Sequence, residues 1–184
     1  MIRLFAALRP PEPIRDALLD LQAGVADARW QDDGQLHLTL RFMGEVERPV
    51  AEELADAFQQ LRGSAIPARL AGAGMFGGRG RAGALWVGAQ PRDPIAALHR
   101  KIDQLCVRIG LEPERRAFTP HVTVARLSRG AGVNGPEVEA WLARHGGFAS
   151  EPFVFDRAVL FQSRLGRAGA SYEPVVETPL IPAA

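Results

Sequence analysis

The sequence Leu36-His-Leu-Thr-Leu-Arg-Phe42 alternates apolar and polar residues with a period of two. This alternation is typical of a β-strand that is buried on one face. A second stretch, His121-Val-Thr-Val-Ala-Arg126, opens with the same succession of histidine, apolar residue, threonine and apolar residue, and its histidine lies 84 residues after His37. Because residues i and i+2 of a strand share a face, each copy should present an imidazole and a hydroxyl together.

The repeat is more informative than either copy alone. A single histidine on a strand is more often a hydrogen-bonded structural residue than a catalyst, but two such matches among four histidines have odds on the order of one in a thousand. Two strands that face each other would place two imidazoles and two hydroxyls around one cleft, as an acid–base pair with donors for phosphoryl oxygens. Neither motif contains Asp, Glu or Cys to complete a metal site, which favours chemistry without a metal or cofactor.

Composition narrows the class of protein. The chain has 184 residues, 47% of them hydrophobic, enough for one sizeable domain or two small lobes that share a core. Its 22 basic and 21 acidic residues leave a net charge of +1, so any contact with nucleic acid must be local. Cys106 is the only cysteine, which excludes an internal disulfide and fits a reducing environment. With no apolar run long enough for a membrane span or a signal peptide, we expect a cytoplasmic protein. We also expect it to be a monomer.

Apolar spacing and Pro/Gly signals elsewhere predict the remaining elements. We expect strands over residues 2–8, 36–42, 66–70, 85–88, 121–126 and 153–161, and near 172–176. Helices are expected after Pro13 with the stripe Ile14, Leu18, Leu21 and Val25, from Pro49 to a stop at Gly63, over residues 94–109, and over 137–144. Residues 72–83 are rich in glycine and arginine, fit no phosphate-loop spacing, and are interpreted as a long hairpin loop. These elements predict an α/β protein with mostly antiparallel pairing.

Several other side chains receive an ordinary structural interpretation. His99 and His145 are expected at the surface or at helix ends. Phe5, Phe42 and Trp86 are expected in the core rather than as platforms for bases, since each lies in a strand-like pattern. Four arginines in turn-rich segments are candidates for a basic rim that faces nucleic acid: Arg79, Arg81, Arg164 and Arg167.

The duplicated motif resembles the hallmark of the 2H phosphoesterase superfamily. The resemblance extends over most of the chain, except residues 72–83. Within the superfamily, the sequence is similar to bacterial and archaeal RNA 2′,3′-cyclic phosphodiesterases, also called 2′-5′ RNA ligases. It rests on these stretches: Arg3-Leu-Phe-Ala-Ala-Leu8, Leu36-His-Leu-Thr-Leu-Arg-Phe-Met-Gly-Glu45, Phe118-Thr-Pro-His-Val-Thr-Val-Ala-Arg126, Leu160-Phe-Gln-Ser-Arg-Leu165 and Tyr172. It implies a single domain, residues 1–184, of two intertwined lobes: two antiparallel sheets with flanking helices, related by a pseudo-twofold axis, with the active site between them.

The resemblance also implies a reaction. RNA ends that carry a 2′,3′-cyclic phosphate would be opened to a 2′-phosphate, with minor 2′-5′ ligation in reverse. His37 would be the general acid and His121 the general base, while Thr39 and Thr123 would bind the phosphoryl oxygens. Arg126 is expected on the same face of its strand as His121 and Thr123, where it would add a positive charge.

Two alternatives remain open at this point. The same machinery would serve another cyclic nucleotide, a cyclic-phosphate metabolite or the trimming of RNA 3′ ends. A protein of a different class, a non-catalytic RNA-binding module, would keep the cleft without the chemistry. The presence of both histidines and both threonines argues against that second alternative.

Overall fold

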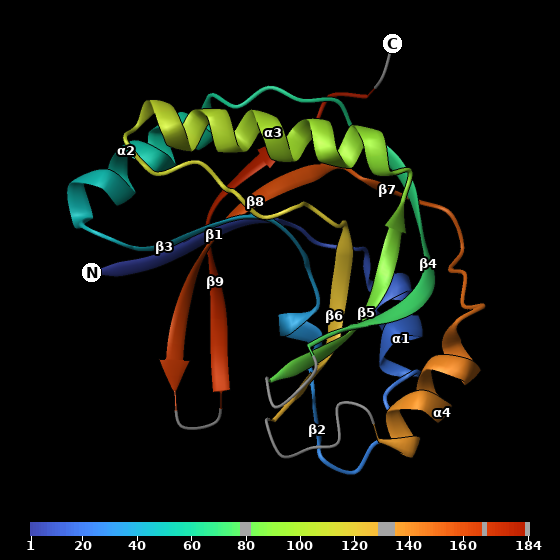
Figure 1. The fold of residues 1–184 in the computed structure, drawn as a ribbon. Coiled ribbons are helices and arrows are strands. Elements are labelled where there is room, and N and C mark those ends of the chain that lie inside the picture. Colours follow the sequence, from blue (N-terminus) through green and yellow to red (C-terminus); the bar gives the residue numbers. More distant parts are fainter. Residues whose placement is uncertain (78–81, 129–134, 167–168, 183–184) are drawn as a thin grey trace.

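The structure is a computed structural model that describes residues 1–77, 82–128, 135–166 and 169–182. This part of the chain forms nine strands and four α-helices (Figure 1). The strands are β1 (Ile2–Leu8), β2 (Ala28–Trp30), β3 (Leu38–Val46), β4 (Ile66–Phe76), β5 (Gly83–Gln90), β6 (His121–Leu127), β7 (Phe153–Phe155), β8 (Arg157–Gly166) and β9 (Gly169–Pro179). The helices are α1 (Glu12–Leu19), α2 (Arg48–Gln59), α3 (Arg92–Arg108) and α4 (Pro136–His145), with a 3₁₀ turn, η1, at Asp33–Gln35.

The strands pair in the order β7-β4-β5-β6-β3-β1-β8-β9, and β2 lies beside β6. Every pairing between these strands is antiparallel. Between β3 and β6, however, only one residue pair is formed, Leu38 with Val122. The sheet is therefore two antiparallel halves joined at one point. The predicted α/β fold with two antiparallel sheets is confirmed, with the refinement that the two sheets are continuous through this pair.

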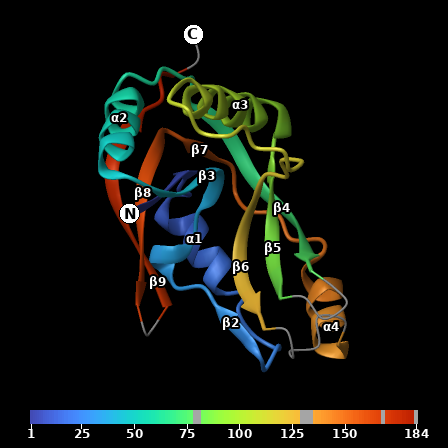
Figure 2. The same cartoon turned by 60° about the vertical axis from the view of Figure 1, so that its left-hand side comes forward.

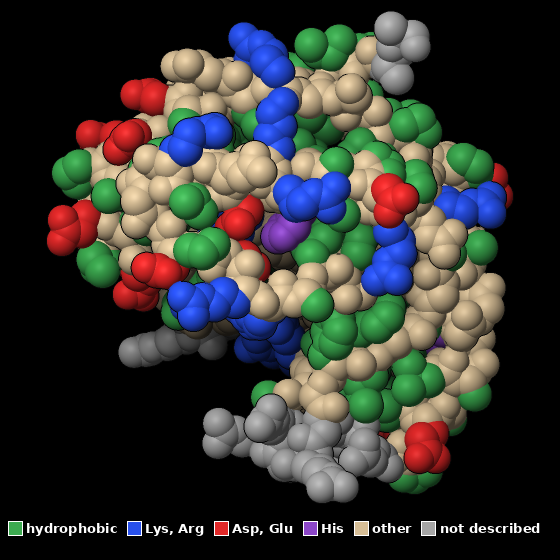
Figure 3. All heavy atoms as spheres, turned by 45° about the horizontal axis from the view of Figure 1, so that its top comes forward, with side chains coloured by type: hydrophobic (Ala, Val, Ile, Leu, Met, Phe, Trp, Pro, Cys, Tyr) green, Lys and Arg blue, Asp and Glu red, His purple; other side chains and the backbone are tan. Residues whose placement is uncertain are grey.

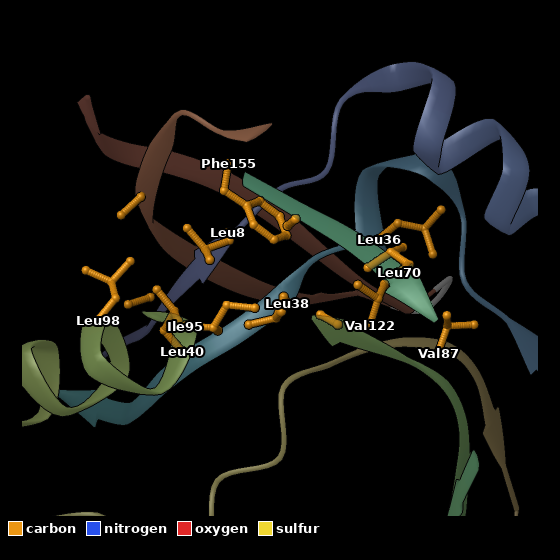
Figure 4. Close-up of a cluster of buried hydrophobic side chains, with 14 of the residues drawn as sticks. Leu8, Leu36, Leu38, Leu40, Leu70, Val87, Ile95, Leu98, Val122 and Phe155 are labelled. Atoms are coloured by element: carbon orange, nitrogen blue, oxygen red, sulfur yellow. The ribbon is translucent and has the colours of Figure 1, made fainter. Parts of the chain in front are cut away.

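Leu38 and Val122 are equivalent residues of the two motifs, since each follows a motif histidine directly. Both side chains are completely buried and lie within one large apolar core (Figure 4). The helices cover this core: α2 and α3 lie side by side in both views of the ribbon (Figures 1 and 2). Helix α3 packs against β3, α2 against β9 and β1, and α4 against β4. Residues from both halves thus share one hydrophobic interior.

Four expectations about the elements need correction. Helix α1 ends at Leu19, so Leu21 and Val25 reach the core from non-helical chain, where the Leu21 carbonyl accepts a 2.9 Å hydrogen bond from Trp141. Strand β4 continues to Phe76, so residues 72–76 of the predicted loop are strand. The predicted strand 153–161 breaks between β7 and β8, which pair with different halves of the sheet. Strand β2 was not predicted, because three residues are too few for a periodic pattern.

Removal of the Leu38 side chain tests the importance of the contact between the halves. We expect Leu38→Ala to lower the free energy of unfolding by about 2–5 kcal/mol, because it leaves a cavity in a fully buried site. Urea denaturation followed by circular dichroism measures the change. Leu165→Ala is the control, since this leucine is 69% exposed and its truncation should change stability by less than about 0.5 kcal/mol. Equal effects of the two substitutions would contradict the expectation.

Candidate active site

The two motifs adopt the same local structure. His37 lies between η1 and β3, one residue before the strand begins, although the sequence predicted it within a strand; His121 is the first residue of β6. Over residues 37–42 and 121–126 the burial of successive side chains follows one order: half-buried, buried, half-buried, buried, buried, exposed. The histidine and threonine of each copy therefore point away from the core, as predicted, while Leu38 and Val122 point into it.

A β-bulge follows the threonine in each motif. The pairing of β1 with β3 skips Leu40, and the pairing of β5 with β6 skips Val124, which is the equivalent residue. A bulge shifts the alternation of side chains by one residue. Arg126 consequently faces the same side as Thr123, as expected. Without the bulge, regular alternation would have turned Arg126, three residues after Thr123, to the opposite face. Phe42 is brought to the same side of β3 in the same way.

Both motifs line one cavity with a volume of about 910 Å³. The five residues singled out from the sequence contribute to its wall: His37, Thr39, His121, Thr123 and Arg126. The space-filling view shows the surface hollowed on its lower left side, with Lys and Arg side chains gathered in the hollow (Figure 3). Residues of both halves of the sheet thus meet around a single space that is open to solvent.

Aromatic rings flank each motif histidine. The His37 ring lies 4.8 Å from Phe5 and 5.1 Å, edge-on, from Tyr172. On the other side of the cleft, the His121 ring lies 4.8 Å, edge-on, from Phe76 and 5.9 Å from Trp86. Such surroundings disfavour a charged imidazole unless an anion is present.

The expectation that Phe5, Phe42 and Trp86 belong to the core holds only in part. Phe5 is buried, in a small cluster with Ala7, Val159 and Phe161 beneath His37. Phe42 is 37% exposed and lines the cavity, with the Arg3 guanidinium 5.0 Å from its ring centre. The expectation was wrong for Phe42 because the bulge at Leu40 turns it away from the core. It was also wrong for Trp86, which is half-buried outside both apolar clusters and packs against Phe76 and His121.

The pKa of both motif histidines is lowered. Burial is the main cause for His37, whose pKa falls to about 4; a hydrogen bond with the Gln35 backbone opposes the shift, and the charges of Arg126, His121 and Arg9 add to it. Burial and Arg126 lower the pKa of His121 too, against a 2.6 Å hydrogen bond that its Nδ1 donates to the Thr119 carbonyl. This bond fixes Nδ1 as the protonated nitrogen and leaves Nε2 for a ligand.

The other two histidines occupy different environments. His99 was predicted at the surface, but it is buried: its Nδ1 donates to the carbonyl of the bulged residue Leu40 at 2.6 Å, and its ring stacks on Phe118 at 4.1 Å. Sequence spacing did not reveal this role because the acceptor is a backbone group on another element. His145 is the last residue of α4, as predicted, and packs against Trp141.

Of the four candidate RNA-facing arginines, the structure describes only Arg164, which is not among the residues that line the cavity. Arg164 forms a 2.9 Å ion pair with Glu173 on the β8–β9 hairpin, and Arg79, Arg81 and Arg167 lie outside the described residues. Within the described ranges, no three His, Cys, Asp or Glu side chains are grouped so that they could hold a metal ion. The described helices include none with the length and apolar character needed to cross a membrane.

Comparison with known proteins identifies the family. Residues 10–167 match the family described as the 2′-5′ RNA ligase superfamily. The chain belongs to this superfamily. Among curated relatives, an RNA 2′,3′-cyclic phosphodiesterase of Aeropyrum pernix is 31% identical over 79% of this chain and 82% of its own length. A protein of the same name from Geobacillus stearothermophilus is 28% identical over 88% of this chain, which spans only 51% of that relative.

Solved structures of the superfamily share the fold. The crystal structure of E. coli LigT complexed with 3′-AMP superimposes with a TM-score of 0.78 at 26% identity, and the match covers 97% of this chain and 98% of that one. The arrangement of two half-sheets around a cleft is therefore the superfamily fold.

The low pKa of His37 is directly measurable. We expect its ring resonances in NMR spectra to titrate near pH 4 rather than near 6.5, because burial disfavours the imidazolium. Since the unfolded chain binds this proton more readily, the free energy of unfolding should fall as the pH drops from about 6.5 toward 4. His37→Asn should remove the resonance and flatten that pH dependence. Titration of His37 near 6.5 would contradict the burial assigned to it.

Proposed function

We propose that this protein hydrolyses RNA 2′,3′-cyclic phosphate ends to 2′-phosphates as a single catalytic domain. The observation that carries the proposal is the placement of both duplicated motifs on the wall of one cavity, each with its imidazole and hydroxyl turned out of the core. The curated relatives are named for this activity, and E. coli LigT has been crystallised with the nucleotide 3′-AMP. The name of the relatives supports the cyclic phosphate end as substrate, and the LigT complex supports a nucleotide as ligand.

Ring opening requires two proton transfers. Water attacks the phosphorus atom, the P–O3′ bond breaks, and the phosphate stays on O2′. One histidine must take a proton from the attacking water, and the other must give one to the departing O3′. We assign the first role to His121, whose Nδ1–H is engaged by Thr119 so that Nε2 can accept, and the second to His37, following the family pattern.

Thr39, Thr123 and Arg126 would stabilise the charge on the phosphoryl oxygens. The two hydroxyls are donors placed one on each side of the pair that joins the half-sheets. The Arg126 guanidinium lines the same cavity as both histidines, and its charge lowers the pKa of each. A preorganised cation at that point stabilises the additional negative charge of the transition state.

Binding of the substrate would also provide the protonation state that the reaction needs. The lowered pKa values make both histidines neutral near pH 7 in the free protein. The anionic cyclic phosphate favours an imidazolium beside it and raises both pKa values, so that one proton can be shared by the pair. With a 5′-hydroxyl in place of water, the same groups would join RNA ends through a 2′-5′ bond, which we expect as a minor activity.

Substitution of the motif residues tests the assigned roles. His37→Ala and His121→Ala should each lower kcat at least about 10²-fold on an oligoribonucleotide with a 2′,3′-cyclic phosphate, assayed in EDTA because the mechanism uses no metal. The double variant should be slower by much less than the product of the two losses. Thr39→Ala and Thr123→Ala should cost less, since other donors remain. His145→Ala is the control and should retain full activity. Activity that EDTA abolishes and added metal restores, or folded histidine variants with near-normal turnover, would refute the mechanism.

The pH dependence should distinguish the free from the substrate-bound protein. Because both histidine pKa values lie below 6.5 in the free protein, kcat/KM should be bell-shaped with its maximum below pH 6.5. The maximum of kcat should lie at higher pH, because the bound phosphate raises both values. Initial rates at saturating and at low substrate concentration separate the two profiles. A kcat/KM that still increases above pH 7 would be inconsistent with the assigned pair.

A further inference from the structure

The short strand β2 places two positive charges directly opposite each other. In the ladder between β2 and β6, Arg29 is paired with Arg126, and both side chains are exposed and line the cavity. Within the described residues, neither guanidinium forms an ion pair with a carboxylate. Like charges opposite each other in a ladder destabilise a sheet. An anion between the two guanidinium groups would remove that cost.

Gln31 adds an unpartnered donor to the same wall. Its backbone N–H donates to the carbonyl of Val124 at 2.9 Å, which fixes it beside the bulge in β6. The residue is only 5% exposed and lines the cavity, and its amide nitrogen has no hydrogen-bond partner among the described residues. Buried donors are nearly always paired, so this amide is suited to an acceptor supplied by a ligand.

These groups lie beyond the motif histidines along β6. The pair that joins the half-sheets is at Val122, Gln31 is bonded to Val124, and Arg29 is opposite Arg126. At about 3.3 Å per residue, and allowing for the bulge, the backbone of Arg29 is roughly 10–13 Å from the central pair. That separation leaves room for a second phosphate beside the one bound between the histidines. The cavity of about 910 Å³ is continuous over both positions.

We propose that Arg29 and Gln31, together with Arg126, bind a second phosphate of the substrate: the one that links the terminal nucleoside to the preceding nucleotide. The proposal rests on the proposed function and specifies its substrate as a nucleotide chain rather than a nucleoside cyclic phosphate. Arg29 binds the phosphate through two parallel N–H donors, the bidentate geometry that guanidinium groups offer to phosphates. Gln31 donates its amide N–H to the same group, and Arg126 lies between the two phosphates.

The test compares substrates that differ only in the second phosphate. Adenosine 2′,3′-cyclic phosphate lacks it; the same compound with a 5′-phosphate, and a dinucleotide with a 2′,3′-cyclic phosphate end, carry it. We expect Arg29→Gln to reduce kcat/KM about tenfold, through KM, for the two compounds with a second phosphate. The nucleoside cyclic phosphate should change less than about twofold. Arg48→Gln, an exposed arginine at the start of α2, controls for loss of charge.

Gln31→Leu separates binding from folding. The substitution removes the amide donor and keeps the size of the side chain, so affinity for the second phosphate should fall while the free energy of unfolding does not. The second-phosphate site would be overturned if Arg29→Gln lowered activity to the same extent on all three substrates, or if it lowered activity on none of them. A fall in stability of Gln31→Leu with unchanged affinity would assign Gln31 a structural role instead.

Binding measurements keep this proposal distinct from the proposed function. Isothermal titration with adenosine 2′-monophosphate and with adenosine 2′,5′-bisphosphate requires no turnover. The bisphosphate should bind the unmodified protein more tightly, and Arg29→Gln should abolish the difference. If none of the three substrates is hydrolysed, the proposed function fails. The binding comparison between the monophosphate and the bisphosphate then decides by itself whether the second-phosphate site exists. If hydrolysis occurs and the two ligands bind equally, only the second-phosphate site fails.

Discussion

The backbone pair between Leu38 and Val122 is the constraint on which the site depends. Both side chains point into the common core, so the residues on either side of each must point the other way. Those neighbours are the two histidines and the two threonines. A shift of one residue in either strand would bury the imidazoles and expose the leucine and the valine, at the cost of the core. The hydrophobic effect therefore fixes the register that brings the polar groups together.

The local symmetry of the motifs is used to build an asymmetric cleft. Each motif is followed by a bulge that returns its sixth residue to the cleft: Phe42 in one copy, Arg126 in the other. Between threonine and sixth residue, Arg41 is buried and binds Asp103 at 2.7 Å, whereas its counterpart is Ala125. An aromatic surface on one side and a cation on the other would distinguish the two ends of a bound molecule, although the pair of motif histidines is itself symmetric.

The electrostatics of the cleft favour an anion. Aromatic rings and burial lower the pKa of both histidines, and Arg126 lowers each of them further. Arg29 and Arg126 are held opposite each other without acidic partners in the described part of the chain. Bringing cations together and desolvating histidines reduces the stability of the free protein, and an anion bound between these groups would compensate both effects. A site arranged in this way binds weakly to neutral molecules.

The sequence by itself determined the class of fold and most elements, and it singled out five residues that the structure places on the wall of one cavity. It could do so because strand alternation is a local property: the pattern His-apolar-Thr-apolar fixes which side chains share a face, and its repetition signals a pair. What only the tertiary structure decided depends on contacts between distant segments. The bulges at Leu40 and Val124 arise from pairing with β1 and β5, and they turn the side chains of Phe42 and Arg126 toward the cleft. Strand β2 exists because β6 offers it a free edge, so Arg29 and Gln31 carried no signal in the sequence. The buried environment of His99 and the low pKa of His37 likewise follow from packing, since burial is a property of the assembled chain and not of its local order.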